Sequence, residues 1–137
     1  MKKDFIKIIQ GSVIISTVGV FVVDYFSHLF LSKPMETTPY FLTKFSLYLI
    51  YSMIFLSFIN LKNKEFIKVL IGGIIVSSIW GTYYNVLPII FDFYPFGIPL
   101  EGLTFLNMGL VGTGFAFGVV HTVAFLLGYY SKKLLLK

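Results

Sequence analysis

The chain lacks cysteine and arginine altogether, and charged residues make up only 12% of its 137 positions. Without cysteine it cannot form a disulfide, bind zinc or an iron–sulfur cluster through sulfur, or use a thiol nucleophile. Its two histidines, His28 and His121, are too few for a histidine-rich metal site within one chain. We therefore expect no metal site and no cofactor.

The sequence also lacks the motifs that mark common enzymes. The glycine-rich stretch at residues 109–118 has neither the lysine of a phosphate-binding loop nor a strand before it. There is no HExxH motif and no GxSxG nucleophile elbow, and we assign no catalytic residue. The net charge of +5 comes from lysines beside apolar runs rather than from a free basic stripe, so we expect no nucleic-acid partner.

Apolar residues are abundant and make up 57% of the chain. A soluble domain is about 45–50% apolar and about 25% charged, so lipid is the solvent that this composition favours. Four apolar runs have the ~20 residues that a helix needs to cross a bilayer, at 8–31, 41–61, 69–91 and 103–130. Backbone groups in lipid must be paired within the protein, which favours helices. We predict an all-α polytopic membrane protein, a single domain over residues 1–137, built as a bundle of four transmembrane helices.

The connectors between these runs are short, so helices that follow one another in sequence are expected to be antiparallel neighbours. The lysines predict the orientation, because positively charged flanks stay in the cytoplasm. With four crossings, nine lysines fall on one side: Lys2, Lys3, Lys7, Lys62, Lys64, Lys68, Lys132, Lys133 and Lys137. Only Lys33 and Lys44 fall on the other side. We predict a multi-pass protein of the cell membrane with both termini in the cytoplasm.

Small residues predict where the helices pack together, since membrane helices associate through close packing. The third run has Gly73, Ser77 and Gly81 at intervals of four, and the fourth has Gly114 and Gly118. We expect the third and fourth helices to pack along these two stripes. These stripes can serve either of two contacts: packing between helices inside one bundle, or an interface between copies of the chain.

Polar residues inside the apolar runs are the candidate site. Asp24, Asn85 and Asn107 come from three different runs and fall at similar depths in the outer half of the bilayer. Charged residues at such depths are costly, and they often mark sites. Asp24 lies four residues before His28, so the two share a helix face. We predict one ligand-binding pocket, open outward, lined by these four residues and Tyr84.

The leading functional hypothesis is a non-enzymatic membrane protein that binds a small molecule or a lipid in this pocket, as a transport component or a subunit of a complex. One alternative is an oligomeric transporter or channel. Another is a membrane-embedded, lipid-modifying enzyme that uses Asp24 and His28 as acid–base groups. The expected partners are the lipid bilayer, further copies of the chain and other membrane subunits. His121 is expected to be a hydrogen-bonded structural residue that faces Ser77 or Ser78.

Overall fold

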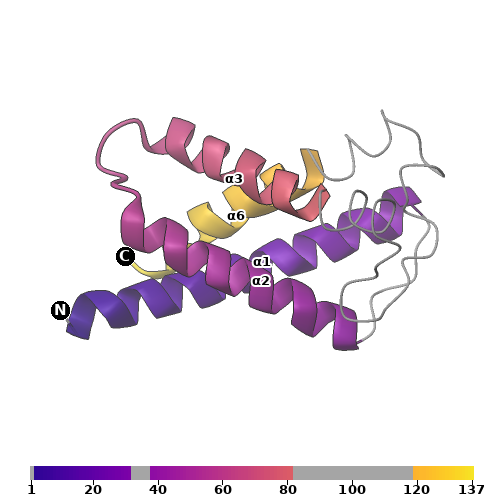
Figure 1. Ribbon diagram of the computed structural model, residues 1–137, viewed down its shortest axis with the longest axis horizontal. Helices are drawn as coiled ribbons and strands as arrows, with labels where there is room; N and C mark the ends of the chain where they lie inside the picture. Colours follow the sequence, from indigo (N-terminus) through magenta and orange to yellow (C-terminus); the bar gives the residue numbers. More distant parts are fainter. Residues whose placement is uncertain (1, 32–37, 82–118) are drawn as a thin grey trace.

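A computed structural model describes residues 2–31, 38–81 and 119–137 of the chain. These residues form four helices and no strand, which confirms the all-α prediction for this part of the chain. The helices are α1 (Lys2–Leu31), α2 (Thr38–Phe58), α3 (Glu65–Gly81) and α6 (Val120–Leu135) (Figure 1). The rest of the third predicted run and most of the fourth lie outside the described residues.

The helices extend beyond the apolar runs where charged residues flank them. α1 begins at Lys2 rather than near residue 8, α3 begins at Glu65 rather than near residue 69, and α6 continues to Leu135. Backbone hydrogen bonds do not require apolar side chains, so a helix can continue into a lysine-rich flank. Glu65 in the first turn of α3 and the lysines in the last turn of α6 also oppose the partial charges of the helix ends.

One helix of the described chain is long and apolar enough to cross a membrane. It covers Asp4–Phe26 in α1, 23 residues with a mean hydropathy of 2.0, and a shorter apolar helix covers Lys44–Phe58. The core helix of a soluble protein and an N-terminal signal sequence can have the same length and composition. Length and composition therefore do not by themselves distinguish these three cases.

The helices pack in an order that differs from their order in the sequence. α1 packs closely against α2 and α6, and α6 packs closely against α3, whereas the backbones of α2 and α3 come near each other at few points. Both termini and the connector between α2 and α3 lie at one end of the bundle (Figure 1). The three lysine-rich segments of the chain therefore gather at that end.

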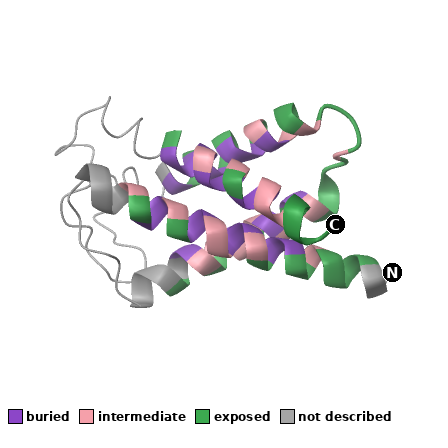
Figure 2. Ribbon diagram, turned by 180° about the vertical axis from the view of Figure 1, so that it is seen from behind, coloured by how far each residue is buried: buried purple, intermediate pink, exposed green. Residues whose placement is uncertain are grey.

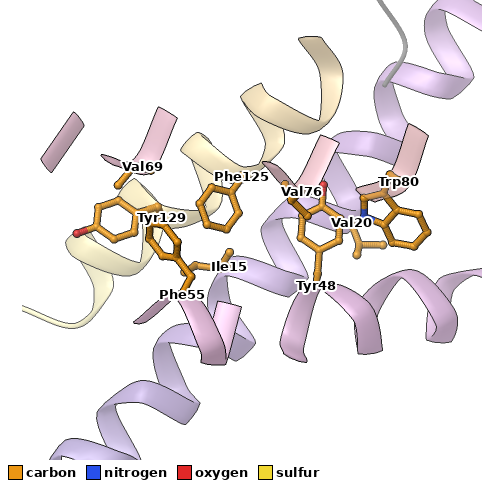
Figure 3. Packing of buried hydrophobic residues seen from close by; sticks show 9 residues of the cluster. All are labelled: Ile15, Val20, Tyr48, Phe55, Val69, Val76, Trp80, Phe125 and Tyr129. Carbon is orange, nitrogen blue, oxygen red and sulfur yellow. The ribbon is translucent and has the colours of Figure 1, made fainter. Parts of the chain in front are cut away.

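Aromatic side chains fill the wider space between α2 and α3. The Tyr51 hydroxyl donates to the Gly72 carbonyl at 2.5 Å. Phe55 covers Gly72 so closely that a Cβ on the glycine would lie 2.5 Å from the ring. Phe55 also meets Phe125 of α6 edge to face, with the ring centroids 5.2 Å apart (Figure 3). The bundle core thus combines aromatic rings from α2, α3 and α6 with aliphatic side chains from α1 and α3.

Glycines allow α6 to approach both of its neighbours. A Cβ on Gly128 of α6 would lie 2.8 Å from the carbonyl oxygen of Ile15 in α1. A Cβ on Gly73 of α3 would lie 3.1 Å from the Thr122 carbonyl oxygen. Gly73 and Ser77, two members of the predicted stripe, therefore face α6. Their predicted partners Gly114 and Gly118 lie outside the described residues. Gly81 is the last residue of α3, and its surroundings are not described.

Candidate functional site

A charged pair lies inside the bundle, where α1 crosses α2. The Lys44 ammonium donates to Asp24 Oδ1 at 3.2 Å, and only 6% and 5% of the two side chains are exposed. Taking two charges out of water costs several kcal/mol per ion, and such a pair persists only when its partners meet with good geometry. Lys44, one of the two lysines predicted on the outer side, is therefore a buried partner of Asp24.

A second polar pair lies one helical turn further along α2. The Tyr48 hydroxyl lies 2.7 Å from Nδ1 of His121 in α6, and both residues are buried. The Trp80 ring of α3 stacks on both, with centroid distances of 5.6 Å to His121 and 6.1 Å to Tyr48. Three helices thus meet at one imidazole, and the four residues Lys44, Tyr48, Trp80 and His121 bring a cation, a phenol, an indole and an imidazole into one region.

Hydroxyl groups extend this buried polar region. Ser77 of α3 and Thr122 of α6 share a hydrogen bond of 3.0 Å. Ser16 of α1 donates to the Ser12 carbonyl at 2.7 Å. The hydroxyls of Ser12 and Ser52 are buried without a hydrogen-bond partner in the described part of the chain. Because an unpaired buried hydroxyl is costly, these two are places where a water molecule or a ligand atom would be stabilising.

We define the buried polar cluster as Asp24, Lys44, Tyr48, Trp80 and His121. Of the predicted pocket residues, Asp24 belongs to this cluster. His28 lies in α1, but its side chain is not among those the structure describes, and Tyr84, Asn85 and Asn107 lie outside the described residues. The predicted convergence of these residues with Asp24 stays a prediction. The prediction that His121 is a hydrogen-bonded residue agrees with its bond to Tyr48, while Ser77 bonds to Thr122.

The sequence contains a signal for Lys44 as the partner of Asp24, in the positions of the two residues relative to the helix ends. Asp24 lies seven residues before the end of α1 at Leu31, and Lys44 lies six residues after the start of α2 at Thr38. In an antiparallel hairpin these positions are at nearly equal depth, about 9–11 Å from the helix ends that the turn joins. Two opposite charges at equal depth on adjacent helices are therefore candidates for an ion pair.

A separate polar contact joins α3 to α6 at the end of the bundle where the termini lie. Glu65 accepts hydrogen bonds from Lys133 at 2.8 and 3.0 Å and from the Tyr129 hydroxyl at 2.8 Å. The hydrogen bonds from Lys133 and Tyr129 lower the pKa of Glu65. The bond between Lys133 and Glu65 also raises the pKa of Lys133. Within the described ranges, no group of three or more histidine, aspartate or glutamate residues is placed to hold a metal ion.

Comparison with known proteins gives no relative: no protein-family model, no curated protein and no solved structure matches this chain. Fold and site together define an all-α protein of four described helices with a charged pair and a tyrosine–histidine pair in its core. What this arrangement does must follow from its own chemistry.

The hydrogen bond between Tyr48 and His121 can be tested by removing one hydroxyl. Tyr48→Phe keeps the ring and its stacking and is expected to cost about 1 kcal/mol of unfolding free energy. Tyr25→Phe is the matched control, because Tyr25 of α1 is exposed and its hydroxyl lies outside the core. Denaturant unfolding of both purified variants checks this. Equal stability of the two variants would show that the bond does not contribute.

Proposed function

We propose that this chain is a multi-pass membrane protein with four crossings, and that its buried polar cluster binds a small zwitterionic molecule or a zwitterionic lipid headgroup. The observation on which the proposal depends is the distribution of side chains. Polar groups lie inside the bundle, and large apolar side chains cover its outside.

The exposed surface supports the membrane part of the proposal. Five isoleucines at helical spacing make up most of the outward face of α3, which also includes Phe66 and Ser78: Ile67, Ile71, Ile74, Ile75 and Ile79. Exposed positions also run along the outer sides of α1 and α2 (Figure 2), and the exposed apolar residues there include Phe21, Ile50 and Ile54. Meanwhile the interior holds Ser12, Ser16, Asp24, Lys44, Ser52, Ser77, His121 and Thr122. Large continuous apolar surfaces are rare on soluble monomers, while polar groups facing the bundle interior are usual in membrane proteins.

Lysine positions support the proposed orientation. The N-terminus, the α2–α3 connector and the C-terminus lie at one end of the bundle, and their nine lysines belong to that end (Figure 1). Lys44 is buried with Asp24, so it does not weigh against this assignment. A single-sided excess of lysine in short connectors and tails is typical of the cytoplasmic side.

Labelling of single cysteines tests the orientation, because the chain has no cysteine of its own. Lys64→Cys, in the exposed connector between α2 and α3, is expected to resist a membrane-impermeant maleimide in intact cells and to react after permeabilisation. Glu36→Cys, in the predicted outer connector, should react in intact cells. Labelling of Lys64→Cys from outside would contradict the proposal.

The charged pair indicates the class of ligand. A ligand that enters between Asp24 and Lys44 separates two buried charges, and leaving either one unpaired costs about 3–5 kcal/mol. A molecule with both an anionic and a cationic group replaces both partners at once. A simple anion, a simple cation or a neutral molecule replaces one partner at most. The ligand class is therefore zwitterionic, as in amino acids or phosphocholine headgroups.

A thermal unfolding assay in detergent tests this binding. Dihexanoyl phosphatidylcholine, a short-chain zwitterionic lipid, is expected to raise the unfolding temperature by a few degrees, since ligands stabilise the state that they bind. Choline chloride alone and inorganic phosphate alone should not. The matched variant is Asp24→Asn combined with Lys44→Met, which removes both charges and should not respond. An equal response of that variant would place the ligand elsewhere and refute the assignment.

The transporter alternative is supported by one further feature, the succession of titratable groups through the bundle. Lys44 and Tyr48 lie one turn apart on α2, and Tyr48 bonds to His121. Chains of neighbouring titratable side chains act as relays in proteins that move protons or ions across membranes. Proton or amino-acid flux into liposomes that contain the protein, abolished in Tyr48→Phe, would favour this function over binding alone.

A further inference from the structure

A cleft of about 190 Å³ lies at the opposite end of the bundle from the Asp24–Lys44 pair. Its lining comes from α1, α2, the following connector and the C-terminal end of α6, as Lys7, Ile8, Leu56, Leu61, Lys132 and Leu136. Lys7 and Asp24 are 17 residues apart on α1, about 25 Å along the helix axis. The cleft is therefore separate from the buried polar cluster.

Gly11 positions one of the two lysines. The Lys132 side chain lies across this glycine, where a Cβ would be 3.0 Å from Lys132 Cε and 3.2 Å from its Cγ. Its ammonium lies 5.3 Å from the centre of the Tyr129 ring. Lys7 precedes Gly11 by four residues, so both lie on the same face of α1. The absence of a side chain at Gly11 thus lets Lys132 reach over α1 toward Lys7.

The electrostatics of the cleft favour an anion. No acidic side chain is part of its lining, which consists entirely of described residues. Glu65, whose charge acts on Lys132, is already bonded to Lys133 and Tyr129. Burial lowers the pKa of Lys132, because its surroundings solvate the charge poorly. Lys7 and Lys132 both line the cleft, so an anion bound there would be attracted by two positive charges.

We propose that this cleft binds an anionic phospholipid, with the headgroup phosphate between Lys7 and Lys132 and the adjoining chain atoms against Ile8, Leu56 and Leu136. The cleft is smaller than the roughly 300–1,000 Å³ of sites that enclose a whole small molecule, so it holds the headgroup region while the rest of the lipid stays in the bilayer. The proposal rests on the membrane embedding proposed above and is independent of the ligand of the buried polar cluster.

Electron paramagnetic resonance with spin-labelled lipids tests the proposal. The full chain is reconstituted into phosphatidylcholine vesicles, and the immobilised fraction is compared for spin-labelled phosphatidylglycerol and phosphatidylcholine. The wild type is expected to prefer phosphatidylglycerol. Each lysine near a headgroup contributes about a fivefold change in affinity, so Lys7→Gln combined with Lys132→Gln should lower the preference about 25-fold. Lys7→Arg combined with Lys132→Arg should retain it.

The control removes the same charge from the same end of the bundle. Lys62→Gln combined with Lys64→Gln changes two exposed lysines outside the cleft, and it should keep the preference. An equal loss in both glutamine pairs would overturn the proposal in favour of diffuse charge attraction. Displacement of the labelled lipid by excess inorganic phosphate would overturn it in favour of a site for a free anion. Flotation of the vesicles shows whether the protein is embedded in them. If the wild type floats with the vesicles but does not prefer phosphatidylglycerol, this proposal alone is overturned. If the wild type does not float with them, the proposed membrane embedding is overturned as well.

Discussion

Lys44→Met is expected to destabilise the folded protein by about 3–5 kcal/mol, because Asp24 would then lose the buried cation to which it is bonded. Methionine has nearly the same length as the lysine stem, so the loss reports the charge rather than a cavity. Asp24→Asn alone leaves the lysine charge in the core and should cost a similar amount. Denaturant unfolding in a single detergent measures both.

The double variant decides whether the two charges act as a pair. Asp24→Asn combined with Lys44→Met leaves no buried charge and should recover at least about 2 kcal/mol relative to the sum of the single variants. Lys62→Met, at an exposed position of the connector, is the control and should change stability by less than about 0.5 kcal/mol. Losses that simply add in the double variant would mean that the ion pair does not couple α1 to α2.

The second large effect is expected at the contact between α1 and α6. Gly128→Ala should cost about 1–3 kcal/mol, because the new Cβ would lie 2.8 Å from the Ile15 carbonyl oxygen and 3.0 Å from its Cα. These are backbone atoms, so the two helices must move apart. Gly128→Leu should prevent the bundle from forming, as shown by loss of the monodisperse folded species in size-exclusion chromatography.

Gly11→Ala provides the comparison, since Gly11 is also buried in the bundle. Its Cβ would meet the ends of flexible side chains, Lys132 Cε at 3.0 Å and Leu56 Cδ1 at 3.1 Å, which can shift. Alanine also favours a helix over glycine by about 1 kcal/mol, so this variant should be close to neutral. If both alanine variants lost the same stability, the close backbone approach at Gly128 would not be the cause.

These two sites illustrate how far sequence reasoning reaches. The apolar run at residues 8–31 predicted the helix that α1 forms, and the charged flank that α1 includes from Lys2 onward was missed. The sequence shows the stripe of Gly73 and Ser77, whereas nothing in it distinguishes Gly128 from the other glycines of the fourth apolar run as a contact point. Spacing shows that small residues share a face, and it does not show which neighbouring helix lies against that face.

The candidate site shows the same limit. Asp24 was found because a carboxylate inside an apolar run is costly in any apolar environment. The sequence itself pairs Asp24 with His28 in the same helix, because residues four apart share a helix face and this relation can be read from one sequence. The contact with Lys44 depends on how α1 and α2 cross and on the rotation of α2 about its axis. α2 is apolar on nearly all sides, so its sequence gives little indication of that rotation.

By itself, the sequence determined that this chain forms helices, because long apolar runs with few charges satisfy their backbone groups most simply within a helix, and that Asp24 would need a partner. Only the tertiary structure decided that the partner is Lys44, that Tyr48 and Trp80 enclose His121, and that α2 and α3, although consecutive in the sequence, come near each other at few points. Helix formation depends on contacts within a few residues, whereas these contacts depend on crossing angles and rotations that are set by side-chain packing among all the helices at once.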